Sequence, residues 1–243
     1  LRFFGIEGSR PRRTERSAPR AAALAVPREI VAAGLTQAEL DILSGEGFRI
    51  VAQRNLGLLA NLTVRLRAPA RLSMRRAVDR IRTLAPSALV DLNHLYRGAA
   101  RPCPENQCFS LVAQDARIDG ACSAHGAIGM VDTGIDTEHP ALAGKPVETQ
   151  TVRGPDHRAA SKQHGTDVAI LLTRGAKAGD PSEIIAVDAF HRRGGSDNAD
   201  SFDLVGALDL LAQRDVRVVN LSLAGPANAL VERIGQAMQQ RGT

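Results

Sequence analysis

An acid and a histidine, Asp132 and His164, both stand where an apolar run meets a glycine-containing turn. The run 127–131 is rich in strand-forming residues and ends at Asp132, so the acid is expected at the carboxyl end of a buried strand. That edge of a sheet is where α/β proteins hold their ligands. His164 precedes Gly165 and the apolar run 168–172, which predicts an imidazole at the start of a helix. A carboxylate that orients this imidazole would make it a general base.

Three segments carry motifs that indicate a family. They contain Asp132, Thr133, Gly134, Ile135, His139, Pro140 and Leu142 around the acid, His164, Gly165, Thr166, Val168 and Ala169 around the histidine, and Val218, Val219, Asn220, Ser222, Leu223 and Gly225 further on. In this order they resemble the motifs of the subtilisin-like serine proteases, the subtilases. Ile170 and Ala224 depart from the family pattern, which has glycine at both positions. The resemblance implies that Asp132 orients His164, which acts as general base toward a serine in peptide hydrolysis.

The third segment is expected to hold the substrate backbone. Its run 216–221 has the continuous apolar character of an inner parallel strand. The resemblance places the substrate-binding residues directly after that run, at Ser222, Leu223, Ala224 and Gly225. Main-chain hydrogen bonds from such a strand hold any extended peptide, while pockets select its side chains. The expected partner is therefore an extended peptide or protein substrate, and no metal and no cofactor is implied.

The nucleophile of such a triad has no motif in this sequence. Neither a G-T-S-x-A segment nor the A-G-N segment of an oxyanion hole is present. Loss of the nucleophile costs on the order of 10⁶ in turnover. We therefore expect the 243 residues themselves to be inactive and to be the N-terminal part of a longer precursor. The last strand of its half-sheet would lack a neighbour and expose an apolar edge.

A small domain precedes the subtilase-like segments. The pattern predicts strands at 28–34, 48–53, 59–69 and 88–97, and helices at 36–47 and 71–86. Thr36 with Glu39 forms a capping box, and Ser73 caps the second helix. This β-α-β-β-α-β order is the ferredoxin-like arrangement. Its topology and its position resemble the inhibitory propeptide of the subtilases, which implies an intramolecular partner for the catalytic part.

The predicted fold class is therefore α/β: a ferredoxin-like α+β propeptide-like domain at 28–97, followed by the first half of a three-layer, parallel-sheet subtilisin-like domain at 127–243. Residues 1–27 form a basic leader that is expected to be disordered. Residues 1–20 hold +4 of the formal net charge of +5. Aromatic residues are not interleaved with the arginines beyond Phe3 and Phe4, so no nucleic-acid partner is expected.

Residues 98–126 are expected to be a linker and processing region, because prolines, glycines and polar residues dominate there. The segment contains all three cysteines, Cys103, Cys108 and Cys122, at spacings that indicate no zinc site. Either one disulfide forms with one thiol left over, or all three stay reduced. No apolar run is long enough to span a membrane. We expect export to the periplasm or the medium, with a signal peptide that is not in this sequence.

Two other classes of function fit parts of the sequence. A catalytically dead subtilase-like remnant could act as a protein-binding or protease-inhibitory module, with 28–97 occupying the cleft of a protease. A phosphatase with Asp132 as nucleophile would need a second acid two residues later, but Gly134 stands there. The favoured hypothesis remains a serine endopeptidase precursor of the subtilase family.

Overall fold

The structure, a computed structural model, describes residues 24–98, 127–173, 183–214, 216 and 218–242. In chain order the first part contains β1 (Ala25–Ala33), α1 (Gln37–Gly45), β2 (Arg49–Leu56), β3 (Asn61–Arg67), α2 (Met74–Leu84) and β4 (Leu89–Gly98). Its strands pair antiparallel in the order β2-β3-β1-β4. This is the β-α-β-β-α-β order that the sequence predicts. β1 begins at Ala25, three residues before the predicted start.

Local signals in the sequence explain the two helices of this part. The Thr36 hydroxyl accepts a hydrogen bond from the Glu39 backbone N–H, and the Glu39 carboxylate accepts one from the Thr36 N–H, so the predicted capping box is present. The Ser73 hydroxyl accepts from the Arg76 N–H at the start of α2. Both helices cover one face of the sheet through an apolar cluster that includes Ile30, Leu40, Leu43, Phe48, Leu66 and Ile81.

The second part contains β5 (Ile128–Asp132), η2 (Pro140–Leu142), β6 (Val147–Thr151), α4 (Gln163–Thr173), β7 (Ile184–Asp188), β8 (Phe190–Arg193), β9 (Ser196–Asp200), α5 (Ser201–Gln213), β10 (Val218–Leu221), β11 (Leu223–Ala224) and α6 (Ala229–Gln240). Four of these strands form a parallel sheet in the order β10-β5-β7-β6. The molecule is therefore a mixed α/β protein with one antiparallel and one parallel sheet. The elements predicted from the sequence do not include β6, β7 or the hairpin β8–β9.

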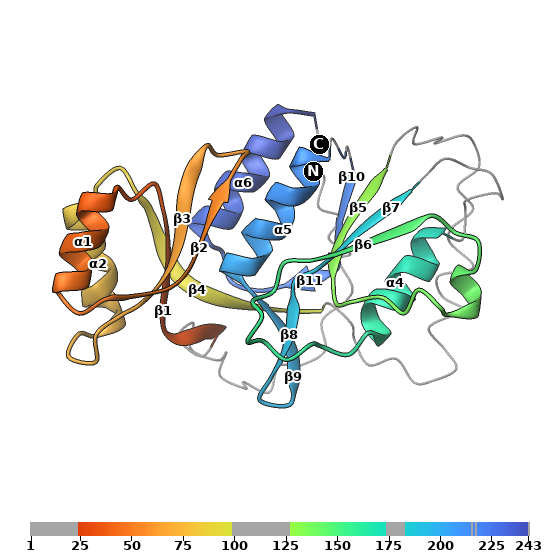
Figure 1. The fold of residues 1–243 in the computed structure, drawn as a ribbon, viewed down its shortest axis with the longest axis horizontal. Helices are drawn as coiled ribbons and strands as arrows, with labels where there is room; N and C mark the ends of the chain where they lie inside the picture. The colour runs from red at the N-terminus through yellow and green to blue at the C-terminus, as the bar shows by residue number, and fades with distance from the viewer. Residues whose placement is uncertain (1–23, 99–126, 174–182, 215, 217, 243) are drawn as a thin grey trace, which may run out of the picture.

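Helices cover both faces of the parallel sheet, because side chains alternate along its strands. On β5, Met130 points into a cluster with Ala169 of α4, and Val131 points into the cluster formed with α5. α5 and α6 lie between the two sheets (Figure 1). β10 lies at the edge of the sheet order, where Val218 is 53% and Leu221 38% exposed. Within the described residues β10 (Val218–Leu221) is therefore an edge strand with exposed apolar side chains, as predicted for a last strand without a neighbour, although its apolar run alone is typical of an inner strand.

β4 joins the two parts of the molecule. Beyond its pairing with β1, its end pairs antiparallel with β9 and with β11. It also supplies acceptors to two helix starts, since Asn93 Oδ1 accepts from the Phe202 N–H of α5 at 3.2 Å and Asp91 Oδ2 from the Ala229 N–H of α6 at 3.0 Å. These N–H groups have no partner within their own helices. The antiparallel sheet is therefore docked onto α5 and α6 by directional bonds as well as by apolar contact.

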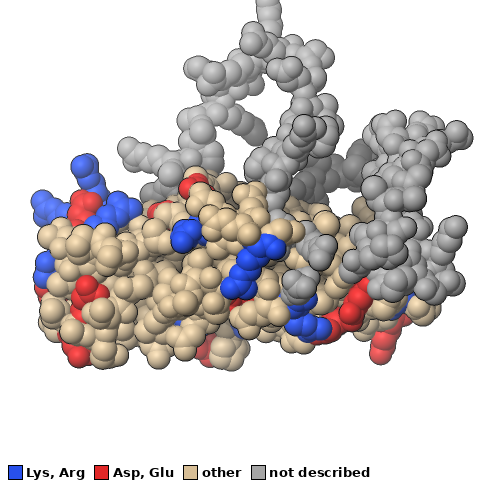
Figure 2. All heavy atoms as spheres, turned by 90° about the horizontal axis from the view of Figure 1, so that it is seen from above, with Lys and Arg blue, Asp and Glu red and all other residues tan. Residues whose placement is uncertain are grey.

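The outer surface shows no single dominant charge on the face drawn in Figure 2. Basic and acidic side chains of the described residues are interspersed there among uncharged ones. Within the described ranges, no helix has the length and apolar character needed to cross a membrane.

Candidate active site

Asp132 and His164 come together at the carboxyl end of β5. The Asp132 carboxyl is buried, with 1% of the side chain exposed, and its Oδ1 lies 2.6 Å from Nδ1 of His164. Because an ionised carboxylate only accepts hydrogen bonds, Nδ1 carries the proton and Nε2 is left as an acceptor. The Thr133 N–H also donates to Oδ1, at 2.7 Å. The acid is thus fixed by its own strand end and in turn fixes the orientation of the imidazole.

Gly165 and Thr166 explain why the helix α4 starts where His164 can reach the acid. A methyl group at Gly165 would lie 2.3 Å from the Thr133 carbonyl oxygen, so only glycine permits this approach of helix and strand end. The Gly165 N–H donates to the Thr133 hydroxyl at 2.8 Å. The Thr166 hydroxyl accepts from the Asp136 N–H at 2.9 Å and closes the turn after β5. The residues of the two predicted motifs therefore hold each other as one unit.

Charge and burial set the protonation of this site. The hydrogen bond to Asp132 raises the pKa of His164, and partial burial opposes that rise. Asp188, at the end of neighbouring β7, pairs in register with Asp132. Burial raises the pKa of Asp188, while its bond to Arg153, 3.1 Å long, lowers it. Two acids thus lie at one sheet edge, one bonded to an imidazole and the other to a guanidinium.

We expect the replacement Asp132→Asn to lower the pKa of His164. The folded pKa of His164 lies above its ordinary value of 6.5, so its protonation stabilises the fold fully below pH 6.5, and this stabilisation is lost as pH rises through the folded pKa. In Asp132→Asn the free energy of unfolding should no longer contain this pH-dependent contribution from His164. NMR titration of the imidazole together with urea unfolding at low and high pH measures both effects. An unchanged imidazole pKa in the variant would contradict the assigned bond.

The predicted substrate-binding segment lies beside the end of β4. Leu223 and Ala224, as β11, pair antiparallel with Gly98 and Arg97 respectively. Ser222 precedes this pair, and its hydroxyl accepts from the Asn220 amide at 2.9 Å. Ala224 is exposed at the edge. The segment predicted to pair with an extended peptide is therefore paired with this chain's own strand.

Tyr96 and Gly98 of β4 complete this contact, although sequence patterns had not singled them out. A methyl at Gly225 would lie 2.3 Å from the Tyr96 ring, and the Tyr96 hydroxyl donates to the Pro226 carbonyl at 3.0 Å. A methyl at Gly98 would lie 3.3 Å from Nε2 of His164. The end of β4 therefore runs along β11 and passes directly over the imidazole.

A cavity of about 240 Å³ adjoins the site at the carboxyl ends of the strands. Thr133, Gly134, Asp188 and Arg153 are among its lining residues. Among the predicted site residues, the structure brings Asp132 and His164 into one site. It places Ser222 to Gly225 beside that site, along the end of β4. The three cysteines and most of the predicted linker 98–126 lie outside the described residues.

Comparison with known protein families identifies this region. Residues 125–243 match the model of the family described as "Subtilase family", Peptidase_S8. No curated protein matches the chain.

Proposed function

Because residues 125–243 belong to the subtilase family of serine proteases, we propose that the chain is the N-terminal part of a serine endopeptidase precursor. In this proposal Asp132 and His164 are two members of an Asp-His-Ser triad. The serine and the oxyanion-hole side chain come from sequence that follows Thr243. The observation that carries the proposal is the 2.6 Å contact between Asp132 and His164 beneath a peptide strand that passes over the imidazole.

The proposed chemistry follows from the protonation of the pair. Asp132 holds the proton on Nδ1, so Nε2 of His164 can accept the proton of a serine hydroxyl as that oxygen attacks a peptide carbonyl. The resulting imidazolium is stabilised by the buried carboxylate and then donates its proton to the leaving amine. Asp132 stays ionised throughout. Ser222, Leu223, Ala224 and Gly225 would bind the substrate backbone by strand addition.

The contact between β4 and β11 supports a propeptide role for the first part. An extended peptide that is bound by strand addition pairs with the edge strand of its receptor, as Arg97 and Gly98 pair with Ala224 and Leu223. In our proposal residues 28–97 form an inhibitory domain whose last strand occupies the substrate position. Cleavage would follow shortly after Gly98, within the processing region 98–126.

The remaining features of the proposal concern the whole precursor. Residues 127–243 would be the first half of a three-layer α/β domain, which fits helices on both faces of the parallel sheet. The exposed apolar side chains of β10, Val218 and Leu221, would be covered by the next strand of the completed sheet. Export of the precursor belongs to the same proposal.

We expect the 243-residue chain to show no turnover of fluorogenic peptides, because loss of a triad nucleophile costs on the order of 10⁶ in kcat. A longer form that carries a G-T-S-x-A segment should cleave the same peptides and cut itself after Gly98. Peptide turnover and mass spectrometry of the fragments test both statements. If the 243-residue chain cleaves peptides and His164→Ala abolishes that cleavage, the triad nucleophile is not missing from this chain. If a serine-containing form stays inactive after removal of residues 1–98, the protease proposal is wrong.

A further inference from the structure

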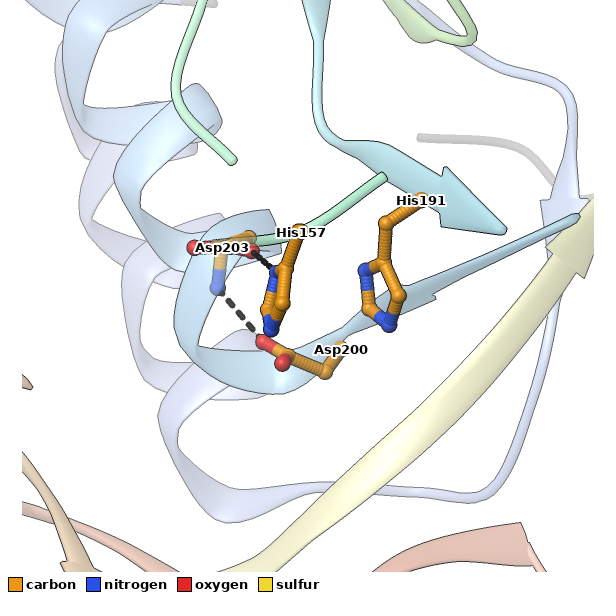
Figure 3. A group of neighbouring side chains, drawn as sticks. All are labelled: His157, His191, Asp200 and Asp203. Carbon is orange, nitrogen blue, oxygen red and sulfur yellow. Dashed lines mark hydrogen bonds and ion pairs between the residues drawn. The ribbon is translucent and has the colours of Figure 1, made fainter. Parts of the chain in front are cut away.

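A second group of ionisable side chains lies apart from Asp132 and His164, where the first part of the molecule (residues 24–98) meets the second part. This His–Asp cluster consists of His157 before α4, His191 on β8, Asp200 at the end of β9 and Asp203 in the first turn of α5 (Figure 3). One potential ligand atom from each residue lies within 4.8 Å of those from the other three. His191, Asp200 and Asp203 are each at most 2% exposed.

Several polar atoms of the cluster are buried without a hydrogen-bond partner among the described residues. They are Nδ1 and Nε2 of His191, Nδ1 of His157 and Oδ2 of Asp203. The two imidazole rings stack with centroids 4.1 Å apart, so neither ring bonds the other in its plane. Nδ1 of His157 lies 3.4 Å from Oδ2 of Asp203, an electrostatic contact that lacks hydrogen-bond geometry. A buried polar atom without a partner costs about 1–3 kcal/mol, so this concentration indicates a missing ligand.

The remaining oxygen of Asp203 and both oxygens of Asp200 accept hydrogen bonds that fix the cluster. Asp203 Oδ1 accepts from Arg54 at 2.8 Å, and Asp200 Oδ2 accepts from Arg65 at 3.2 Å. Asp200 Oδ1 accepts the Asp203 N–H as the cap of α5.

We propose that His157, His191, Asp200 and Asp203 form a binding site for one Zn²⁺ ion. Two imidazoles and two carboxylates are a ligand set suited to zinc, whereas Ca²⁺ and Mg²⁺ prefer oxygen ligands alone. Zinc–ligand bonds of about 2.0–2.2 Å place tetrahedral ligand atoms roughly 3.4 Å apart, so binding would draw the four atoms together by up to about 1.4 Å and turn the stacked imidazoles until one nitrogen of each faces the ion. The site lies at the junction with the first part and uses neither Asp132 nor His164, so it does not depend on the proposed protease chemistry.

Arg54 of β2 and Arg65 of β3 oppose this site. Both come from the first part of the chain and already offset the charges of Asp203 and Asp200. A divalent ion placed between the same carboxylates would repel the two guanidinium groups. Zinc binding and the docking of residues 25–98 should therefore weaken each other, since such coupling is reciprocal.

Titration of the 243-residue chain with Co²⁺, a spectroscopic substitute for Zn²⁺, tests the site. Cys103, Cys108 and Cys122 are replaced by serine in all samples, so that no thiolate can bind the metal. We expect one Co²⁺ per chain with the visible absorption of a four-coordinate ion, and its displacement by Zn²⁺. His191→Ala and the nearly isosteric Asp203→Asn should each weaken binding more than about tenfold, because loss of even an outer-shell partner costs 10–100-fold. The matched control, His139→Ala, removes the partly exposed histidine that caps η2, lies outside the His–Asp cluster and should bind like the parent.

Two outcomes decide against the proposal, and neither requires the variants to keep full stability. One is a parent chain that is folded by circular dichroism and binds neither Co²⁺ nor Zn²⁺, in which case the free atoms bond to buried water. The other is an equal loss of affinity in Asp203→Asn and His139→Ala when both are folded. Arg65→Met, which keeps the apolar stem, should tighten Co²⁺ binding about tenfold; unchanged or weaker binding would overturn the opposition between the ion and the docked domain.

Discussion

Asp132→Asn should lower the kcat of the serine-containing protease about 10⁴-fold, which is the cost of the equivalent change in a well-characterised Ser-His-Asp triad. The Asp132 Oδ1 atom accepts from both Nδ1 of His164 and the Thr133 N–H. An asparagine can turn its NH₂ group toward the imidazole, which then carries its proton on Nε2 and cannot accept from serine. The neutral amide also cannot stabilise the imidazolium that forms during the reaction.

The neighbouring acid supplies a matched control for this effect. Asp188 lies at the same sheet edge but bonds to Arg153 and to the Phe190 N–H. Asp188→Asn should therefore change kcat less than about tenfold, because no contact with His164 is lost. Initial rates with a saturating peptide substrate give kcat for both variants. If Asp132→Asn keeps more than a tenth of the parent kcat, or if both variants lose the same factor, Asp132 does not have the proposed role.

Local signals made the first part of the fold predictable. The capping box at Thr36 and Glu39, the cap at Ser73 and strict apolar periodicity identify each element within a few residues. Asp132 and His164 could be found for the same reason, since each is adjacent to residues that the local geometry requires. Gly165, for example, must be glycine because of the Thr133 carbonyl.

β7 carries the same apolar pattern as β5, whereas β6 and the hairpin of β8 and β9 depend on long-range contacts. β6 reads Val-Glu-Thr-Gln-Thr and its side chains are partly or fully exposed, so no apolar pattern marks it; its pairing with β7 makes it a strand. The hairpin of β8 and β9 is polar, and its turn at Gly194 and Gly195 was the only local signal. β10 is the opposite case. Its apolar run is typical of an inner strand, and the exposed edge at Val218 and Leu221 was predicted from the half-sheet rather than from the run itself.

Contacts between distant segments were equally inaccessible. Gly98 and His164 are 66 positions apart, and no spacing rule relates them, yet the glycine backbone lies over the imidazole. The His–Asp cluster combines a loop, two strands and a helix start. Asp200 and Asp203 are three residues apart, but the two histidines lie 34 positions from each other, and such a spacing does not mark a metal site in a sequence. Such sites can be located only once the order of the strands in the sheets is known, because that order determines which chain segments become neighbours.

Gly165→Ala should destabilise the 243-residue chain by about 2–3 kcal/mol, even though alanine is the better helix former. The added methyl would lie 2.3 Å from the Thr133 carbonyl oxygen and 2.8 Å from that of Gly134. Both atoms belong to the backbone at the end of β5, so neither can rotate away, and overpacking of this kind typically costs 1–3 kcal/mol. The displaced helix start should also separate His164 from Asp132 and return the pKa of His164 toward 6.5.

Gly235→Ala is the matched control, because this glycine lies inside α6 with no atom within 4 Å of an added methyl. There the substitution should stabilise the chain by about 0.5–1 kcal/mol through helix propensity alone. Urea denaturation gives both free energies of unfolding, and NMR titration gives the imidazole pKa. If the free energy of unfolding of Gly165→Ala lies within about 0.5 kcal/mol of that of the parent, and the pKa of His164 is unchanged, the close approach of α4 to β5 is not what holds Asp132 and His164 together.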